Sequence, residues 1–148
     1  MSYLTDQEIV LEPQGVAHPE GDDGAEARFL GKVRKLEREE PVDYLEYEAY
    51  RPMAESLIDQ LVDKAKNRWA LTDVWVQHRL GKIPVGQVAV AIVTRAPHRK
   101  EAFEACQFLI DSIKHDVPIW KRAHGVSGEW IESEDGCGVK PEKISQTN

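Results

Sequence analysis

Basic residues gather in one short part of a chain that is acidic overall. The 148-residue chain carries a net charge of −7. Between positions 95 and 122 it nevertheless holds Arg95, His98, Arg99, Lys100, Lys114, Lys121 and Arg122. Such a cluster keeps a local positive site against the overall charge, which suits a small anion, and phosphate is the anion that we expect.

The spacing of these cations limits how one ligand can meet them. A helix is expected over residues 98–117, and it places His98 and Lys114 about 24 Å apart at about 1.5 Å per residue. One small-molecule pocket cannot hold both residues from the same helix. If both serve one ligand, two copies of the chain must share the pocket, which predicts a two-fold symmetric homodimer.

The helix ends of this cluster suit the same chemistry. His98 and Arg99 stand where the free N–H groups and the dipole of a helix favour an anion, and an arginine can bind phosphate through two hydrogen bonds. Lys121 and Arg122 follow Pro118 and Trp120, a bulky side chain that can anchor the segment. Each cation alone would suit a solvated surface, so it is their grouping that indicates a site.

Apolar periodicity predicts the elements that must position these residues. A 3.6-residue period predicts helices at residues 53–69 and 98–117, the second ended by Pro118. Alternating or continuous apolar runs predict strands, with further short extended pieces, at residues 3–10, 25–33, 42–50, 74–80, 88–94, 119–122 and 129–132. The apolar run at 88–94 is typical of a central strand that is covered on both faces.

The segments between these elements are expected to be irregular. Residues 13–24 suggest a loop or short helix, 34–41 a charged loop, 81–86 a turn, and 133–148 a mobile tail. The order of elements predicts a single domain over residues 1–148. Its fold class is expected to be an α/β (α+β) sandwich, with a largely antiparallel sheet and two main amphipathic helices.

Composition excludes several classes of protein. No apolar run approaches the about 18 residues that a membrane span needs, and the first residues lack the features of a secretory signal. The acidic balance argues against nucleic acid as the main partner. We therefore expect a cytoplasmic protein that binds neither membranes nor nucleic acid.

The cysteines and histidines predict no metal centre or disulfide framework. The 2 cysteines are Cys106, in an apolar helical stripe, and Cys137, in an acidic segment. Cys106 is expected to be a reduced core residue and Cys137 an incidental thiol. None of the 5 histidines has a second histidine or cysteine at ligand spacing, so no metal is expected.

Four groups of residues together resemble the large, catalytic subunit of molybdopterin synthase, over nearly the whole chain. The groups are Gly31-Lys32-Val33-Arg34, His78-Arg79-Leu80-Gly81 with Val85-Gly86, Pro97-His98-Arg99 with Ala102-Phe103-Glu104-Ala105, and Pro118-Ile119-Trp120-Lys121. The resemblance implies an enzyme of molybdenum cofactor biosynthesis, a sulfurtransferase without a cofactor of its own. Such an enzyme converts cyclic pyranopterin monophosphate to molybdopterin by installing two sulfurs as a dithiolene.

The resemblance also implies roles for individual residues. Lys114 and Lys121 correspond to catalytic lysines, for which a proton shuttle and a covalent adduct both stay open. The pterin- and phosphate-binding positions that it implies are Lys32, Val33, Arg34, His98, Arg99, Lys114, Lys121, Arg122 and Ala123. His98 and Arg99 would reach across the dimer, as the helix length requires independently.

A partner is implied as the source of sulfur. In the family, a small ubiquitin-like subunit carries a thiocarboxylate on its C-terminal Gly-Gly, and two such subunits flank a dimer of large ones in a heterotetramer. This sequence ends in Ser145-Gln146-Thr147-Asn148, so the donor is expected to be another chain. The alternatives are a non-catalytic dimeric module that binds a phosphorylated metabolite or an acidic peptide, and a scaffold that docks a ubiquitin-like tail.

Overall fold

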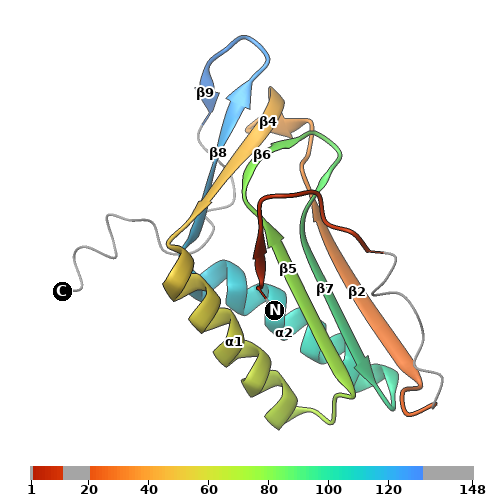
Figure 1. The fold of residues 1–148 in the computed structure, drawn as a ribbon. Helices are drawn as coiled ribbons and strands as arrows, with labels where there is room; N and C mark the ends of the chain where they lie inside the picture. Colours follow the sequence, from red (N-terminus) through yellow and green to blue (C-terminus); the bar gives the residue numbers. More distant parts are fainter. Residues whose placement is uncertain (1, 12–20, 132–148) are drawn as a thin grey trace.

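The computed structural model describes residues 2–11 and 21–131, which form two sheets and two helices (Figure 1). In chain order the elements are β1 (Leu4–Thr5), β2 (Ala25–Lys32), β3 (Leu36–Glu37), β4 (Glu40–Ala49), α1 (Arg51–Arg68), β5 (Asp73–Arg79), β6 (Gly81–Pro84), β7 (Val88–Ala96), α2 (Arg99–Asp116), β8 (Ile119–Gly125) and β9 (Trp130–Ile131). The pairing of β1 with β5 is parallel, and the other described strand pairs are antiparallel. The predicted mixed, largely antiparallel fold class is therefore confirmed.

The first sheet has the strand order β1-β5-β7-β2. Its inner strand β7 is buried from Ala89 to Ala96, as expected for a strand whose side chains are all small or apolar up to Thr94. Helices α1 and α2 lie side by side along this sheet, and α2 contacts β7 and β2 (Figure 1). The central strand predicted at residues 88–94 is confirmed.

Both helices bury the apolar stripe that their sequences predict. In α1, Pro52 stands in the first turn, where a missing N–H group costs no hydrogen bond. In α2 the stripe includes Leu109 and Ile113, and the helix ends at Asp116 because Pro118 disfavours helical geometry in the residue before it. The predicted helices are confirmed, with ends that differ by one or two residues.

The second sheet follows the order β3-β4-β8-β9, with β6 also paired to β4. Two predicted loops are wrong here. Residues 81–86 were expected to form a turn, yet β6 pairs with β4 from Tyr47↔Gly81 to Tyr44↔Pro84, because glycine and proline are tolerated at the ends of a short strand. The charged loop predicted at residues 34–41 contains β3 and its hairpin with β4.

The N-terminal strand is shorter than the predicted strand over residues 3–10. Only Leu4 and Thr5 pair with β5, opposite His78 and Arg79. Beyond them the backbone N–H of Gln7 donates to the Thr5 hydroxyl at 3.2 Å, a local bond that bends the chain out of the sheet.

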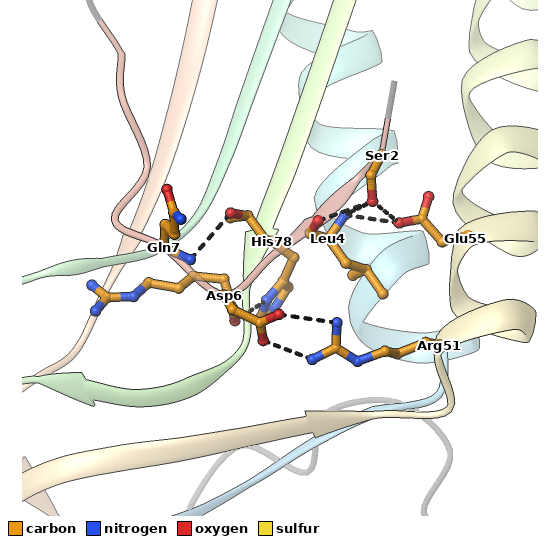
Figure 2. A network of polar contacts seen from close by, with 9 residues as sticks. Ser2, Leu4, Asp6, Gln7, Arg51, Glu55 and His78 are labelled. Atoms are coloured by element: carbon orange, nitrogen blue, oxygen red, sulfur yellow. Dashed lines mark hydrogen bonds and ion pairs between the residues drawn. The ribbon is translucent and has the colours of Figure 1, made fainter.

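Polar contacts hold this N-terminal segment against α1. Figure 2 shows Arg51 facing Asp6, with Nη2 donating to Oδ1 at 2.6 Å, and Ser2 bonded to Glu55. The same view shows His78 beside this segment, which follows from the pairing of β1 with β5. The N-terminus therefore supports the strand that carries His78.

Several expectations concern residues outside the described part of the chain, or features not found within it. The tail expected at residues 133–148, Cys137 and most of the loop expected at residues 13–24 lie outside the described residues. In the described part of the chain, no helix has both the length and the apolar character needed to cross a membrane. Residues 2–11 and 21–131 hold no group of three His, Cys, Asp or Glu side chains placed to bind a metal ion.

Candidate active site

A cavity of about 240 Å³ lies where the two sheets meet the C-terminal half of α2. Its polar lining consists of Lys32, Arg34, Glu37, Tyr47, His78, Lys114 and Lys121. Its apolar lining includes Phe29, Leu30, Val90, Ile110, Ile113 and Ile119. A cavity with apolar walls and several cations suits a ring that carries an anionic group.

The end of β2 supplies two of the cations. A β-bulge between Gly31 and Lys32 shifts the register against β7, and Lys32 and Arg34 both line the cavity. Val33 lies between them with its side chain 2% exposed. Its N–H donates to the Gln87 carbonyl at 3.0 Å and its carbonyl accepts from the Gly86 N–H at 2.8 Å. Val33 therefore fixes the backbone from which the two cations project.

Two lysines reach the same cavity from different elements. Lys114 stands in the last turn of α2, and Lys121 is the third residue of β8. The short connection through Pro118 reverses the chain between them, so both line one cavity. Side chains alternate along β8, and that of Lys121 points inward and is only 6% exposed.

A buried carboxylate lies among these cations. Glu37 ends β3 and is 1% exposed. Its Oε1 faces the Lys121 Nζ at 3.6 Å and the Arg34 Nη2 at 3.8 Å. The cavity therefore contains an internal counter-ion as well as its cations.

His78 contributes a neutral ring to the wall of the cavity. The pKa of His78 is lowered to about 4, mainly by burial and to a smaller extent by the charges of Lys114 and Lys121, against the opposing effect of a backbone hydrogen bond. That bond joins Nδ1 to the Arg79 carbonyl at 2.8 Å, so Nδ1 carries the hydrogen and Nε2 is an acceptor. The ring stands edge-on to Tyr47, with centroids 4.9 Å apart.

The structure places the other predicted site residues away from this cavity. His98 precedes α2 and Arg99 begins it, both exposed, at the end of the helix opposite Lys114. Arg122 lies on the outer face of β8, where it pairs with Glu46 at 3.2 Å and covers the Trp130 ring at 4.0 Å. Ala123 is fully buried, with an exposed fraction of 0%.

Within a single chain, four of the predicted substrate-binding residues therefore line the same cavity: Lys32, Arg34, Lys114 and Lys121. Sequence reasoning missed Glu37 and Tyr47 and did not assign His78 to the site. Glu37 stood in a run of charges, where nothing distinguishes a buried carboxylate from solvated ones. The inward position of Tyr47 could have been found from the alternation along residues 42–50, and His78 from its place at the end of an apolar strand.

The fold and the cavity define a mixed α+β protein with a cavity that is lined by cations and apolar side chains. The chain belongs to the MoaE protein family, whose family model matches residues 4–116. The resemblance to the molybdopterin synthase catalytic subunit is therefore confirmed.

Curated relatives share this name. The chain is 38% identical over 131 residues to the "Molybdopterin synthase catalytic subunit" of Halalkalibacterium halodurans, covering 86% of this chain and 83% of the relative. It is 41% identical over 113 residues to the protein of the same name from Pyrococcus abyssi, covering 76% of each.

Solved structures agree with the family. A molybdopterin synthase structure from Staphylococcus aureus superposes with a TM-score of 0.79 at 34% identity, covering 88% of this chain and 96% of that one. A complex of subunits 1 and 2 of the molybdopterin-converting factor from Helicobacter pylori includes a chain that superposes with a TM-score of 0.67 at 25% identity, covering 80% and 77% of the two chains.

Proposed function

We propose that this chain is the catalytic subunit of a molybdopterin synthase, an enzyme of molybdenum cofactor biosynthesis. It converts cyclic pyranopterin monophosphate to molybdopterin by a sulfurtransferase reaction. The two sulfurs come from the C-terminal thiocarboxylate of a small ubiquitin-like subunit. The family, the names of the relatives and the cationic cavity all support this function.

The observation that carries the proposal is the meeting of Lys114 and Lys121 in one cavity. They come from α2 and β8, two consecutive elements that the short connection through Pro118 turns toward the same cavity. Lys32 and Arg34 add positive charge at the same place. A phosphorylated pterin offers what this lining can bind, because its ring suits the apolar walls and its phosphate suits the cations.

The chemistry of sulfur transfer needs positive charge at a developing anion. Opening of the cyclic phosphate and attack at the acyl carbon of the donor both build negative charge on oxygen. Ammonium groups fixed in a half-enclosed cavity stabilise such charge more than in water, because they need no reorganisation. A lysine there can also transfer a proton or form a transient adduct.

The sulfur donor is proposed to be a separate small subunit. The Helicobacter pylori complex of two subunits of the molybdopterin-converting factor supports such a partner. Its thiocarboxylated tail would enter the cavity beside the bound pterin, and two small subunits would flank a dimer of large ones in a heterotetramer. We also propose that the reaction takes place in the cytoplasm, a compartment in which a free thiol such as that of Cys106 stays reduced.

His98 and Arg99 are proposed to act on the cavity of a second copy. They lie at the start of α2, and His98 is about 24 Å from Lys114, too far to join it on one ligand within the chain. In a two-fold dimer, the first turn of one α2 can approach the cavity of the partner. This arrangement would add a histidine and an arginine to the phosphate site.

The decisive experiment supplies the purified chain with cyclic pyranopterin monophosphate and a thiocarboxylated small subunit. Product is read by fluorescence after oxidation. We expect turnover by the wild type, a loss of about a hundredfold or more in Lys114→Ala, and no loss in Lys64→Ala, an exposed lysine of α1. Binding of the pterin without any product would instead support the non-catalytic module.

A second experiment tests the shared site. Two differently tagged chains, Lys121→Ala and Arg99→Ala, are co-expressed and the mixed dimer is purified. One of its two cavities then has both residues, so we expect about half of the wild-type rate although each variant alone is nearly inactive. A mixed dimer as inactive as its parents would refute the contribution of Arg99 from the partner.

A further inference from the structure

Glu37 occupies a position that the proposed reaction does not explain. The residue is 1% exposed and lines a cavity whose charged lining otherwise consists of cations. Burial of a charge is unfavourable unless partners compensate it, and a negative charge here opposes the binding of an anion. A carboxylate in this place therefore needs a role that outweighs both costs.

The hairpin before β4 holds Glu37 at a fixed point. In the hairpin of β3 and β4, Glu37 lies opposite Glu40 in the strand register. The two residues of the turn between them, Arg38 and Glu39, have φ angles of 48° and 67°. Residues other than glycine adopt this left-handed conformation at a cost and keep it only where their surroundings enforce it. The tight turn leaves the Glu37 side chain little freedom to leave the cavity.

The distances show how Glu37 engages the cations. Its Oε1 lies 3.6 Å from the Lys121 Nζ and 3.8 Å from the Arg34 Nη2. A close charge-assisted hydrogen bond would measure about 2.7–2.9 Å. The Glu37 Oε1 thus attracts both side chains from beyond the length of a close hydrogen bond, and both side chains also line the cavity that an anion would enter.

We propose that Glu37 is a positioning residue that orients the Lys121 ammonium toward the reacting atoms. Its negative charge also weakens the binding of the substrate phosphate in the cavity. This inference rests on the proposed function, because it concerns the same cavity. Without Glu37, Lys121 and Arg34 would bind the phosphate more tightly in its ground state. Lys121 would then be less available where charge develops, and turnover would fall.

The test separates this role from a merely structural one through kcat and KM. In Glu37→Gln, which keeps the shape and removes the charge, we expect kcat to fall about tenfold or more while KM stays equal or falls. Loosening of the hairpin would instead raise KM and lower the melting temperature. The matched control is Glu40→Gln, an exposed carboxylate of the same hairpin, which should behave as the wild type.

A conservative variant guards against failure to fold. Glu37→Asp keeps the charge but withdraws it by one methylene, so kcat should fall less than in Glu37→Gln, again without a rise in KM. If Glu37→Gln does not fold, the kcat and KM of Glu37→Asp, compared with those of the wild type, test the proposal alone. A wild-type kcat in the folded variant, or a raised KM, overturns the proposal.

Binding of inorganic phosphate tests Glu37 without the proposed reaction. By calorimetry, Glu37→Gln should bind inorganic phosphate severalfold more tightly than the wild type, whereas Glu40→Gln should not. Equal affinity in Glu37→Gln and the wild type would overturn the role of the charge. If the wild type binds phosphate but forms no product, the proposed function fails, and the comparison of phosphate affinities still decides for or against Glu37.

Discussion

Two nearly buried cations, Arg95 in β7 and Lys121 in β8, are held in different ways. Arg95 is 5% exposed, and its Nε and Nη1 donate to Glu26 and Asp73 at 2.7 Å and 2.9 Å. The Lys121 side chain is 6% exposed and faces Glu37 at the longer distance of 3.6 Å. Short bonds to two carboxylates fix Arg95 as part of the fold, whereas Lys121 lines the cavity, where a ligand can reach it.

The same substitution should therefore have opposite effects at the two positions, and the largest effect is expected for Lys121→Met. Methionine keeps most of the side-chain volume but removes the charge, so turnover should fall by about a hundredfold or more. Because Arg34 still faces Glu37, the free energy of unfolding should fall by less than about 2 kcal/mol. Product fluorescence and urea unfolding measure the two quantities, and near-normal turnover would remove Lys121 from the mechanism.

Arg95→Met should have the opposite effect, because its main consequence should be a loss of stability. It leaves Glu26 and Asp73 without their shared cation, and we expect a loss of about 3 kcal/mol in the free energy of unfolding, since both carboxylates keep some contact with solvent. The control is Arg28→Met, because Arg28 also pairs with Glu26 but is 36% exposed. It should cost about 1 kcal/mol or less. An equal loss in both variants in urea unfolding would contradict the comparison.

The sequence could not distinguish these two cations. Arg95 and Lys121 both belonged to the basic cluster, because spacing along the chain shows that charges are near one another but not which way each side chain points. The helices and the central strand were predictable, since long apolar patterns at residues 53–69, 88–94 and 98–117 decide them locally.

What sequence reasoning lacked was the geometry that depends on strands far apart in the chain. The pairing of β6 with β4 and the hairpin that buries Glu37 arise from tertiary contacts, so residues 34–41 and 81–86 looked like loops. The convergence of Lys32, Arg34, Lys114 and Lys121 was anticipated only through the family resemblance. Their counter-ion had no local signal, because buried and exposed glutamates look alike in a charged run.

As the pH falls, the cavity should lose stability before the Arg95 cluster does, that is, before the ion pairs of Arg95 with Glu26 and Asp73. The pKa of His78 is lowered to about 4 from the ordinary 6.5, mainly by burial. Below pH 6.5 the unfolded state therefore binds a proton that the native state does not, so stability falls as the pH falls, by about 1.4 kcal/mol per unit. Between pH 6.5 and pH 5 we expect a loss of about 2 kcal/mol.

This loss should disappear in one variant and persist in another. Urea unfolding of His78→Gln should show a flatter dependence on pH in this window, whereas His115→Gln, with a side chain 87% exposed in the wild type, should keep the wild-type slope. Burial alone would raise the pKa of Glu26, but hydrogen bonds from Arg95 and Arg28 outweigh it and lower that pKa. The Arg95 cluster therefore loses stability only at lower pH. An unchanged slope in His78→Gln would show that His78 is not the acid-sensitive group.

The smallest effect is expected for Arg122→Ala, next to Lys121 in the chain. The resemblance predicts that Arg122 binds substrate, whereas its side chain lies on the outer face of β8 against Glu46 and Trp130. Since neighbouring residues of a strand point to opposite faces, Arg122→Ala should change kcat/KM by about twofold or less. A loss comparable to that of Lys121→Met would show that the outer face of β8 meets the substrate, as it could only if a second copy completed the site there.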